Sequence, residues 1–352
     1  MQLVTFERHN EAQGDRSLER ERSGASALGF DSLEPVNLGT RRLGVLIQID
    51  PEDDAVVDLN RALAVKLAGN DAGAPEAEAD SLLPPDMQTF LRHLPASLEA
   101  AHTAHAFALE ALSRYDGPDV RRAGAVVPRR SVRLCAPLPR PGKIIGVARN
   151  YALHASEQGQ RKPPQEPVLF LKATSAVIGP EDEIQIPEAT HDVDYEGELA
   201  AVIGATAREV PAAEALTHVA GYCIANDVSA RDFQNVRGQR FIGKSCDTFA
   251  PLGPALVTRD EIQDPQDLAI RTTVSGEVLQ SGRTKEMLFP VAEIVAFASR
   301  LMTLEPGDVL LTGTPAGVGQ ARKPPRWLRD GDVVEVEIEK LGRLRNYVRE
   351  RR

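Results

Sequence analysis

Short apolar runs separated by turn residues follow one another from residue 143 onwards and predict a series of strands. The alternation is strictest in residues 332–339 (DVVEVEIE), where Val334 and Ile338 share one face and glutamates occupy the other. Apolar residues at helical spacing are clear at one place in this region, directly after Pro290. Many strands, few helices and no regular alternation between them favour a β-rich α+β domain over a doubly wound parallel sheet.

The first part of the chain predicts a smaller domain that contains strands and a helix. The expected elements are strands at residues 2–6, 43–49 and 55–59 and a helix at residues 96–114. Residues 7–40 are rich in Glu, Arg, Gly and Ser, so we expect a flexible insertion between two strands that pair as a hairpin. Residues 70–86 are predicted to form a surface loop. The proline-rich segment 135–143 marks a boundary, which gives an N-terminal domain (1–138) and a larger domain (139–352).

Composition and charge narrow the function classes. The chain has 352 residues, with 51 acidic against 41 basic side chains and a formal net charge of −10. This balance argues against general nucleic-acid binding, which needs a positive surface to displace counterions from phosphate. The 3 cysteines form no CxxC pair, and no run of about 18 apolar residues predicts a membrane span. We therefore expect a cytoplasmic protein with no nucleic-acid or membrane partner.

The clearest chemical signal is a pair of glutamates at the start of an apolar segment, residues 194–204 (DYEGELAAVIG). In a strand Glu196 and Glu198 project from the same face, and Asp227 ends a similar apolar run. If the two strands are neighbours, three carboxylates converge, and such an all-oxygen site suits Mg²⁺, Mn²⁺ or Ca²⁺ rather than Zn²⁺. The alternative interpretation is a solvated strand end.

A second signal is the pair His154 and Glu157, which one helical turn places on the same face. The carboxylate can orient the imidazole and raise its basicity, so that the imidazole takes a proton from water. A surface His–Glu pair is the alternative interpretation of this spacing.

Two further sequence features are interpreted as structural and not as functional sites. Residues 238–245 (GQRFIGKS) satisfy the phosphate-loop pattern, but neither the strand before it nor the helix after it is expected, so we reject nucleotide binding there. His191, Asp192 and Asp194, beside the glutamate pair, are ambiguous, and an exposed loop is their structural interpretation.

These segments, in this order, resemble the fumarylacetoacetate hydrolase family over nearly all of residues 143–348. The segments that carry the resemblance are GVARNYALHASEQG (146–159), EPVLFLKATSAVIGP (166–180), DYEGELAAVIG (194–204), HVAGYCIANDVSARDFQ (218–234), GKSCDTFAPLGPALVT (243–258), LEPGDVLLTGTPAGVG (304–319) and RKPPRWLRDGDVVEVEIEKLGRLRN (322–346). Val147 lies where the namesake enzyme's segment would carry an additional acidic ligand, so the chain looks like the subgroup of fumarylacetoacetate-hydrolase-domain proteins.

The resemblance implies a mixed, rolled β-fold with a small leading domain, a divalent cation such as Mg²⁺ and a homodimer. The residues that match functional positions of the family are Glu196, Glu198 and Asp227 as metal ligands, His154 and Glu157 as the general-base pair, Lys244 and Thr314 beside the reacting oxygen, and Arg231 and Gln234 in the substrate pocket.

The leading functional hypothesis is a metal-dependent hydrolase that cleaves a carbon–carbon bond in a 2,4-dioxo acid, an acylpyruvate-like compound. In this hypothesis His154 and Glu157 activate water for attack on a metal-chelated substrate. The alternative is an isomerase, tautomerase or decarboxylase of a 2-oxo diacid such as oxaloacetate or a 2-hydroxyhepta-2,4-dienedioate-like compound. A metal-binding protein without catalysis is the third hypothesis.

Overall fold

The computed structural model describes residues 1–8, 33, 40–50, 53–70, 73–114, 117–157, 159, 162–234 and 240–351. The chain divides into two units, one of Gln2–Cys135 and one of Met1 with Ala136–Arg352. Most of the predicted insertion 7–40 lies outside the described residues, but Glu7 and Arg8 belong to the first strand. Each helix in the described part of the chain is too short or too polar to cross a membrane.

The smaller unit contains an antiparallel sheet in which the strands follow the order β4–β3–β2–β1–β5. Its strands are β1 (Gln2–Arg8), β2 (Arg42–Asp50), β3 (Asp53–Asp58), β4 (Val126–Pro128) and β5 (Val132–Cys135). Its helices are α1 (Leu59–Ala68), α2 (Pro75–Leu82), α3 (Met87–Arg92), α4 (Ala96–Ser113) and α5 (Gly117–Arg122). The antiparallel pairing of β1 with β2 confirms the predicted hairpin, and α4 confirms the predicted helix.

The sequence prediction is wrong at two places in this unit. Leu59, predicted to end a strand, begins α1, and the buried Asp58 carboxylate caps that helix by accepting a backbone N–H of its first turn at 3.1 Å. Buried residues surround most of α1, so its sequence shows no single apolar stripe. Residues 70–86 contain α2 instead of an uninterrupted loop. Only Ala79 of α2 is buried, which explains the missing amphipathic pattern.

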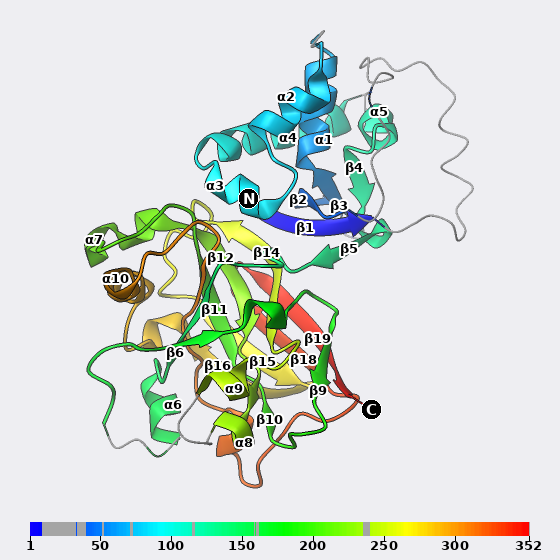
Figure 1. Ribbon diagram of the computed structural model, residues 1–352. Helices are drawn as coiled ribbons and strands as arrows, with labels where there is room; N and C mark the ends of the chain where they lie inside the picture. Colours follow the sequence, from blue (N-terminus) through cyan, green and yellow to red (C-terminus); the bar gives the residue numbers. More distant parts are fainter. Residues whose placement is uncertain are drawn as a thin grey trace. The chain divides into compact units, whose positions relative to one another are not determined.

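Two large sheets and one two-stranded sheet contribute to the larger unit (Figure 1). The first has the strand order β14–β12–β11–β17–β6–β7, with β8 beside β14, and the second has the order β16–β15–β18–β19–β9; β10 pairs with β13. The strands are β6 (Ile144–Ala148), β7 (Val168–Lys172), β8 (Val177–Ile178), β9 (Glu183–Ile186), β10 (Val193–Asp194), β11 (Gly197–Ile203), β12 (Val219–Asn226), β13 (Ser229–Ala230), β14 (Ala250–Thr258), β15 (Ala269–Val274), β16 (Glu277–Arg283), β17 (Val309–Leu311), β18 (Val333–Ile338) and β19 (Gly342–Glu350).

Short helices accompany these sheets: α6 (Ala152–Glu157), α7 (Ala212–Ala215), α8 (Arg231–Gln234), α9 (Arg240–Lys244) and α10 (Val291–Leu301). Both β18 and α10 confirm elements that the apolar pattern predicts. Figure 1 shows α7 and α10 together at one side of the sheets, and α6, α8 and α9 at another. The unit is a mixed, sheet-rich α+β fold, as predicted.

The main apolar core of this unit joins both sheets. Leu199 and Ile203 of β11 pack in it together with Val336 of β18, Leu344 of β19 and Ile294 of α10. One face of β11 is therefore fixed by apolar packing. The other side of the strand is free to present polar side chains at its first residues.

Candidate active site and metal centre

Three buried carboxylates meet at one end of the strand pair β11–β12. Gly197 at the start of β11 is the antiparallel partner of Asn226 at the end of β12. Glu196 and Asp227 flank these partners, and the Asp227 backbone N–H donates to the Glu196 carbonyl oxygen at 2.8 Å. One carboxylate oxygen from each of Glu196, Glu198 and Asp227 lies within 4.8 Å of the others. This geometry confirms the predicted convergence.

Three buried cationic side chains surround the carboxylates. Lys244 Nζ donates to Glu196 Oε2 at 2.6 Å and to Asp227 Oδ2 at 2.5 Å. Arg231 Nη2 donates to Glu196 Oε1 at 2.6 Å. Lys172 Nζ donates to Asp227 Oδ1 at 2.5 Å, so ammonium groups contact both oxygens of this carboxylate. These ion pairs hold Glu196 and Asp227 in fixed orientations.

Electrostatics distinguish the two glutamates. Burial by itself raises the pKa of Glu196, but Lys244 and Arg231 outweigh it and hold that pKa below its ordinary value. For Glu198, burial raises the pKa, and the negative charges of Asp227 and Glu196 raise it further. Without another cation, Glu198 therefore favours its protonated form.

The donor set fits a divalent cation. All three groups are carboxylates, which Mg²⁺, Mn²⁺ and Ca²⁺ prefer. A bound cation would replace the proton that Glu198 otherwise favours, because it neutralises the like charges. The Gly313 backbone N–H donates to Glu198 Oε2 at 2.6 Å and fixes this carboxylate. Gly313 has φ 91°, and a Cβ there would come within 2.8 Å of Asn150 Cβ, so this turn requires glycine.

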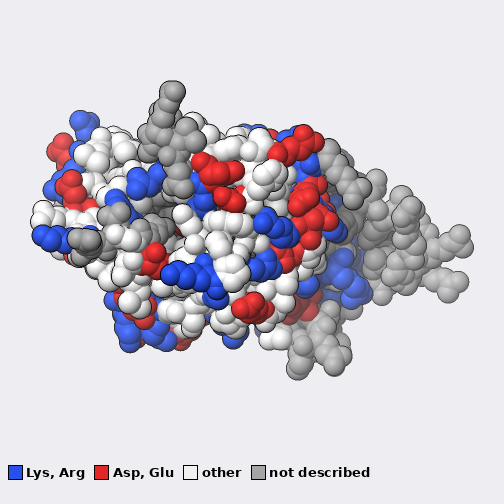
Figure 2. Space-filling model, turned by 90° about the horizontal axis from the view of Figure 1, so that it is seen from below, with Lys and Arg blue, Asp and Glu red and all other residues white. Residues whose placement is uncertain are grey.

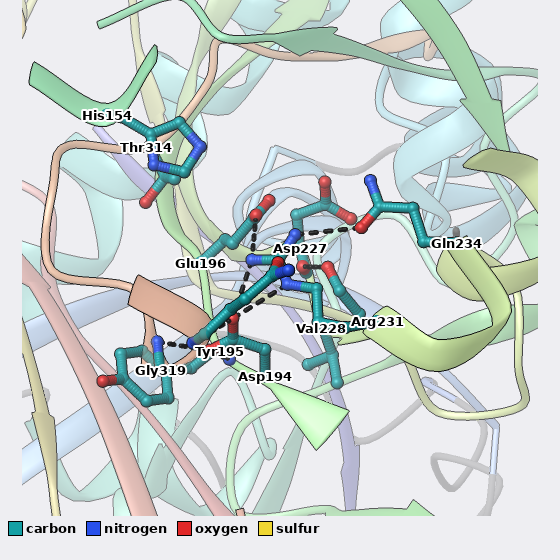
Figure 3. A network of polar contacts seen from close by, with 12 residues as sticks. His154, Asp194, Tyr195, Glu196, Asp227, Val228, Arg231, Gln234, Thr314 and Gly319 are labelled. Carbon is teal, nitrogen blue, oxygen red and sulfur yellow. Dashed lines mark hydrogen bonds and ion pairs between the residues drawn. The ribbon is translucent and has the colours of Figure 1, made fainter. Parts of the chain in front are cut away.

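The predicted imidazole–carboxylate pair is formed in α6. His154 Nδ1 lies 2.8 Å from Glu157 Oε1, and the Gly317 backbone N–H donates to Glu157 Oε2 at 2.9 Å. The imidazole is buried and lines the same cavity as the three carboxylates. In the view of Figure 3, Glu196 lies between His154 on one side and Gln234 on the other. The pair is therefore part of the carboxylate site and not an isolated surface contact.

The cavity that contains these groups has a volume of about 460 Å³. This is within the range of roughly 300–1,000 Å³ that small-molecule sites occupy. It brings together all nine residues that the sequence singles out, namely His154, Glu157, Glu196, Glu198, Asp227, Arg231, Gln234, Lys244 and Thr314. Their roles toward a metal or a substrate are part of the proposal below.

Thr314 lines the cavity and makes two hydrogen bonds within the protein. Its Oγ1 donates to the Gly197 carbonyl oxygen at 2.8 Å and accepts from Gln280 Nε2 at 2.7 Å. The hydroxyl proton is used within the protein in this orientation. Thr314 thus ties its turn to the start of β11, where the glutamates lie.

Asp194 is a correction to the sequence interpretation. It is not in an exposed loop but fully buried, and it accepts from the backbone N–H of Gly319 at 2.6 Å and from Arg231 Nε at 2.8 Å. Arg231 thus contacts both Asp194 and Glu196, which Figure 3 shows on the same side of it. Asp194 therefore positions Arg231. Its burial had no signal in the sequence, because Asp192 and Asp194 both precede the strand as polar residues.

The sequence analysis does not identify three basic residues at or beside the cavity. Lys172 ends β7 and supports Asp227 from behind the cavity, whereas Arg149 and Arg240 line the cavity wall. The rejected phosphate-loop pattern supplies two of the cavity's cations, because α9 begins at Arg240 and ends at Lys244. Since Lys244 is held by two carboxylates, it is not placed to bind a nucleotide phosphate.

Replacement of Lys172 by Met should destabilise the protein strongly. The change leaves one oxygen of the buried Asp227 without its ammonium partner, and breaking a buried ion pair in this way costs about 3–5 kcal/mol. Calorimetry should show a lower Tm for Lys172→Met, while the exposed Lys162→Met should melt like the wild type. Equal Tm values for the two variants would contradict this role of Lys172.

Comparison with known proteins agrees with this geometry. Residues 143–349 match the family described as fumarylacetoacetate (FAA) hydrolase C-terminal. The chain belongs to the fumarylacetoacetate hydrolase family. A human relative, the mitochondrial oxaloacetate tautomerase FAHD2A, is 44% identical over 283 residues, which cover 80% of this chain and 85% of the relative.

Two solved structures are similar to this chain in both sequence and fold. A 2-hydroxyhepta-2,4-diene-1,7-dioate isomerase from Mycobacterium marinum has 43% identity and a TM-score of 0.57, covering 65% of this chain and 82% of that chain. A fumarylacetoacetate hydrolase from Exiguobacterium antarcticum has 39% identity and a TM-score of 0.65, covering 89% and 96%. The comparisons support an enzyme. Two of these three names agree with the isomerase or tautomerase alternative better than with the leading hydrolase hypothesis.

Proposed function

We propose that this protein is a divalent-metal-dependent tautomerase that interconverts the enol and keto forms of a 2-oxo acid such as oxaloacetate. The observation that carries the proposal is the placement of one hydrogen-bonded imidazole–carboxylate pair in the same cavity as three converging carboxylates. Tautomerisation needs a site for the oxygens of the substrate and a group that exchanges one proton with carbon. The relatives named for tautomerisation and isomerisation support this choice over hydrolysis.

Glu196, Glu198 and Asp227 would hold the cation, with Mg²⁺ as the proposed metal. When bound, this cation would chelate the oxygens of the 2-oxo acid and stabilise negative charge on them as a Lewis acid. Lys244 adds a fixed positive charge beside the same oxygens. Burial lowers its pKa, but Asp227 and Glu196 raise it more, so Lys244 stays an ammonium ion.

His154 is the proposed proton carrier. Its Nδ1–H donates to the Glu157 carboxylate, which fixes the ring and makes Nε2 the atom that exchanges the proton. In the enol-to-keto direction the imidazolium gives the proton on Nε2 to the substrate carbon. The proton that leaves the enol hydroxyl restores the imidazolium through water. No carbon–carbon bond changes, and nothing is oxidised or reduced.

Hydrolysis of a 2,4-dioxo acid is the second candidate. The hydrolase from Exiguobacterium antarcticum is 39% identical to this chain, and the same His154–Glu157 pair could deprotonate water instead of exchanging a proton with carbon. Decarboxylation of oxaloacetate would use the same cation site without water attack. The homodimer inferred from the family resemblance remains part of the proposal.

A kinetic assay tests the proposal. Enol-oxaloacetate is added to metal-stripped protein with and without Mg²⁺ or Mn²⁺, and malate dehydrogenase with NADH reports the keto form as it appears. We expect the protein to accelerate formation of the keto form when metal is present and to lose this effect in chelator. Pyruvate formation without faster ketonisation would favour decarboxylation, and no metal-dependent effect would contradict the proposal.

A further inference from the structure

Two arginines on the cavity wall form no ion pair with an acidic side chain of the described residues. Arg149 directly follows β6, and Arg240 begins α9, and both line the cavity that contains the carboxylates. Arg231 and Lys244 of the same cavity are each held by two carboxylates at 2.5–2.8 Å. Neither Arg149 nor Arg240 forms an ion pair with any carboxylate of the described residues. Their positive charges are thus available to a ligand.

The two guanidinium groups are held in an unfavourable state without a ligand. Arg149 Nε is buried and has no hydrogen-bond partner within the described part of the chain. Burial lowers the pKa of Arg240 and the positive charge of Arg149 lowers it further, and the negative charge of Glu196 offsets only part of this. Two like charges, one of them incompletely hydrogen-bonded, cost free energy that an anionic ligand would recover.

The backbone of Arg149 supports a functional interpretation. Its φ is 57°, in the left-handed region that residues other than glycine rarely adopt. The next residue, Asn150, prevents relaxation, because its side chain donates to the carbonyl oxygens of Phe289 and Thr312 and accepts from the Phe289 backbone N–H. A strained conformation that its surroundings enforce is typical of ligand-binding positions.

A general basic surface does not account for the pair. On the face shown in Figure 2, the described Lys and Arg side chains are interspersed with Asp and Glu and form no broad basic area. The unpaired charge of Arg149 and Arg240 is instead located in a cavity of about 460 Å³, the size of a small-molecule site. The planar fork of a guanidinium group matches a carboxylate, which it can bind through two parallel hydrogen bonds.

We propose that Arg149 and Arg240 bind the second carboxylate of the substrate, at the end away from the 2-oxo acid group, and make the enzyme selective for dicarboxylates. This inference rests on the proposed function for the chemistry at the carboxylate cluster. It adds the two residues that recognise the far end of the substrate. The carboxylate cluster with its cation holds one end of the diacid, and the arginines hold the other.

Substrate pairs test the inference. Oxaloacetate and its 4-methyl ester differ at the far carboxylate, where the ester has a methyl group and no negative charge. We expect Arg240→Gln to lower kcat/KM for oxaloacetate about 10- to 100-fold, as for the loss of a hydrogen bond between charged groups, and to leave the ester within about threefold. Arg240→Lys should recover part of the loss. The exposed Arg271→Gln, which does not line this cavity, should behave as the wild type for both compounds.

A binding measurement separates failure of this inference from failure of the proposed reaction. Calorimetry compares malate, which has both carboxylates and no ketone, with 2-hydroxybutyrate, which lacks the far carboxylate, in the presence of Mg²⁺. We expect the wild type to bind malate more tightly and Arg149→Gln and Arg240→Gln to remove this difference. Equal affinity of the wild type for the two acids would overturn the inference, even if the protein is an active tautomerase. A preference for malate that the arginine variants remove would support it, even if oxaloacetate is not turned over.

Discussion

His154→Asn should lower kcat for the ketonisation of enol-oxaloacetate by about 10²–10⁴-fold, the usual contribution of a positioned acid–base group. The imidazole is the proton carrier of the proposed reaction and contacts Glu157 at 2.8 Å. Metal affinity should remain within about twofold, because the carboxylates keep their lysine and arginine partners. Stopped-flow kinetics with the malate dehydrogenase coupling would measure the first effect, and calorimetry with Mn²⁺ the second.

Two further variants make this prediction specific. Glu157→Gln keeps a hydrogen-bond acceptor for Nδ1 but removes the charge that supports the imidazolium, so its kcat should fall less than that of His154→Asn. His102→Asn changes an exposed histidine of α4 and should keep the wild-type rate. A fully active His154→Asn protein would exclude this residue as the proton carrier.

Glu198→Gln should reduce metal affinity by about 100-fold or more, because changes to residues that merely support ligands already cost 10- to 100-fold. The metal-stripped variant should nevertheless be at least as stable as the metal-stripped wild type. The amide removes the charge that burial, Asp227 and Glu196 make unfavourable. It can still accept the hydrogen bond from the Gly313 backbone N–H. Thermal melts with and without Mg²⁺ would show both effects.

The wild type supplies the reference for these melts. Its Tm should rise with Mg²⁺ concentration, because a ligand that binds the folded state alone stabilises it by mass action. Glu188→Gln, an exposed substitution of the same type, should keep this response. If Glu198→Gln retained the full Mg²⁺-dependent rise in Tm, Glu198 would not be a ligand.

Much of the carboxylate centre is predictable from the sequence, because it depends on the alternation of side chains along a strand and on the pairing of β11 with β12. Glu196 directly precedes a strand that contains Glu198, and Asp227 follows another. Once the two strands pair antiparallel with Gly197 opposite Asn226, their acidic ends must meet. The contact between His154 and Glu157 is likewise local, since it needs only one helical turn.

The supporting residues depend on contacts between distant parts of the chain. Lys172 and Asp227 are 55 positions apart, and the sequence around Lys172 shows only the end of an apolar strand. Asp194 is buried by the backbone N–H groups of residues 319 and 320, which are 125 and 126 positions away. Arg240 lines the cavity because α9 lies beside the carboxylates that Lys244 contacts. No local pattern reports such contacts.

The central claim is that His154 exchanges a proton with a carbon of the substrate and that the carbon–carbon bonds of the substrate stay intact. The most direct test is NMR identification of products in deuterated water, with oxaloacetate and acetylpyruvate presented separately to the Mg²⁺-loaded protein and to His154→Asn as background. We predict enzyme-dependent deuterium incorporation at C3 of oxaloacetate, and no conversion of acetylpyruvate to acetate and pyruvate. Rapid formation of acetate and pyruvate by the wild type, without faster exchange into oxaloacetate, would contradict the tautomerase account and restore the hydrolase hypothesis.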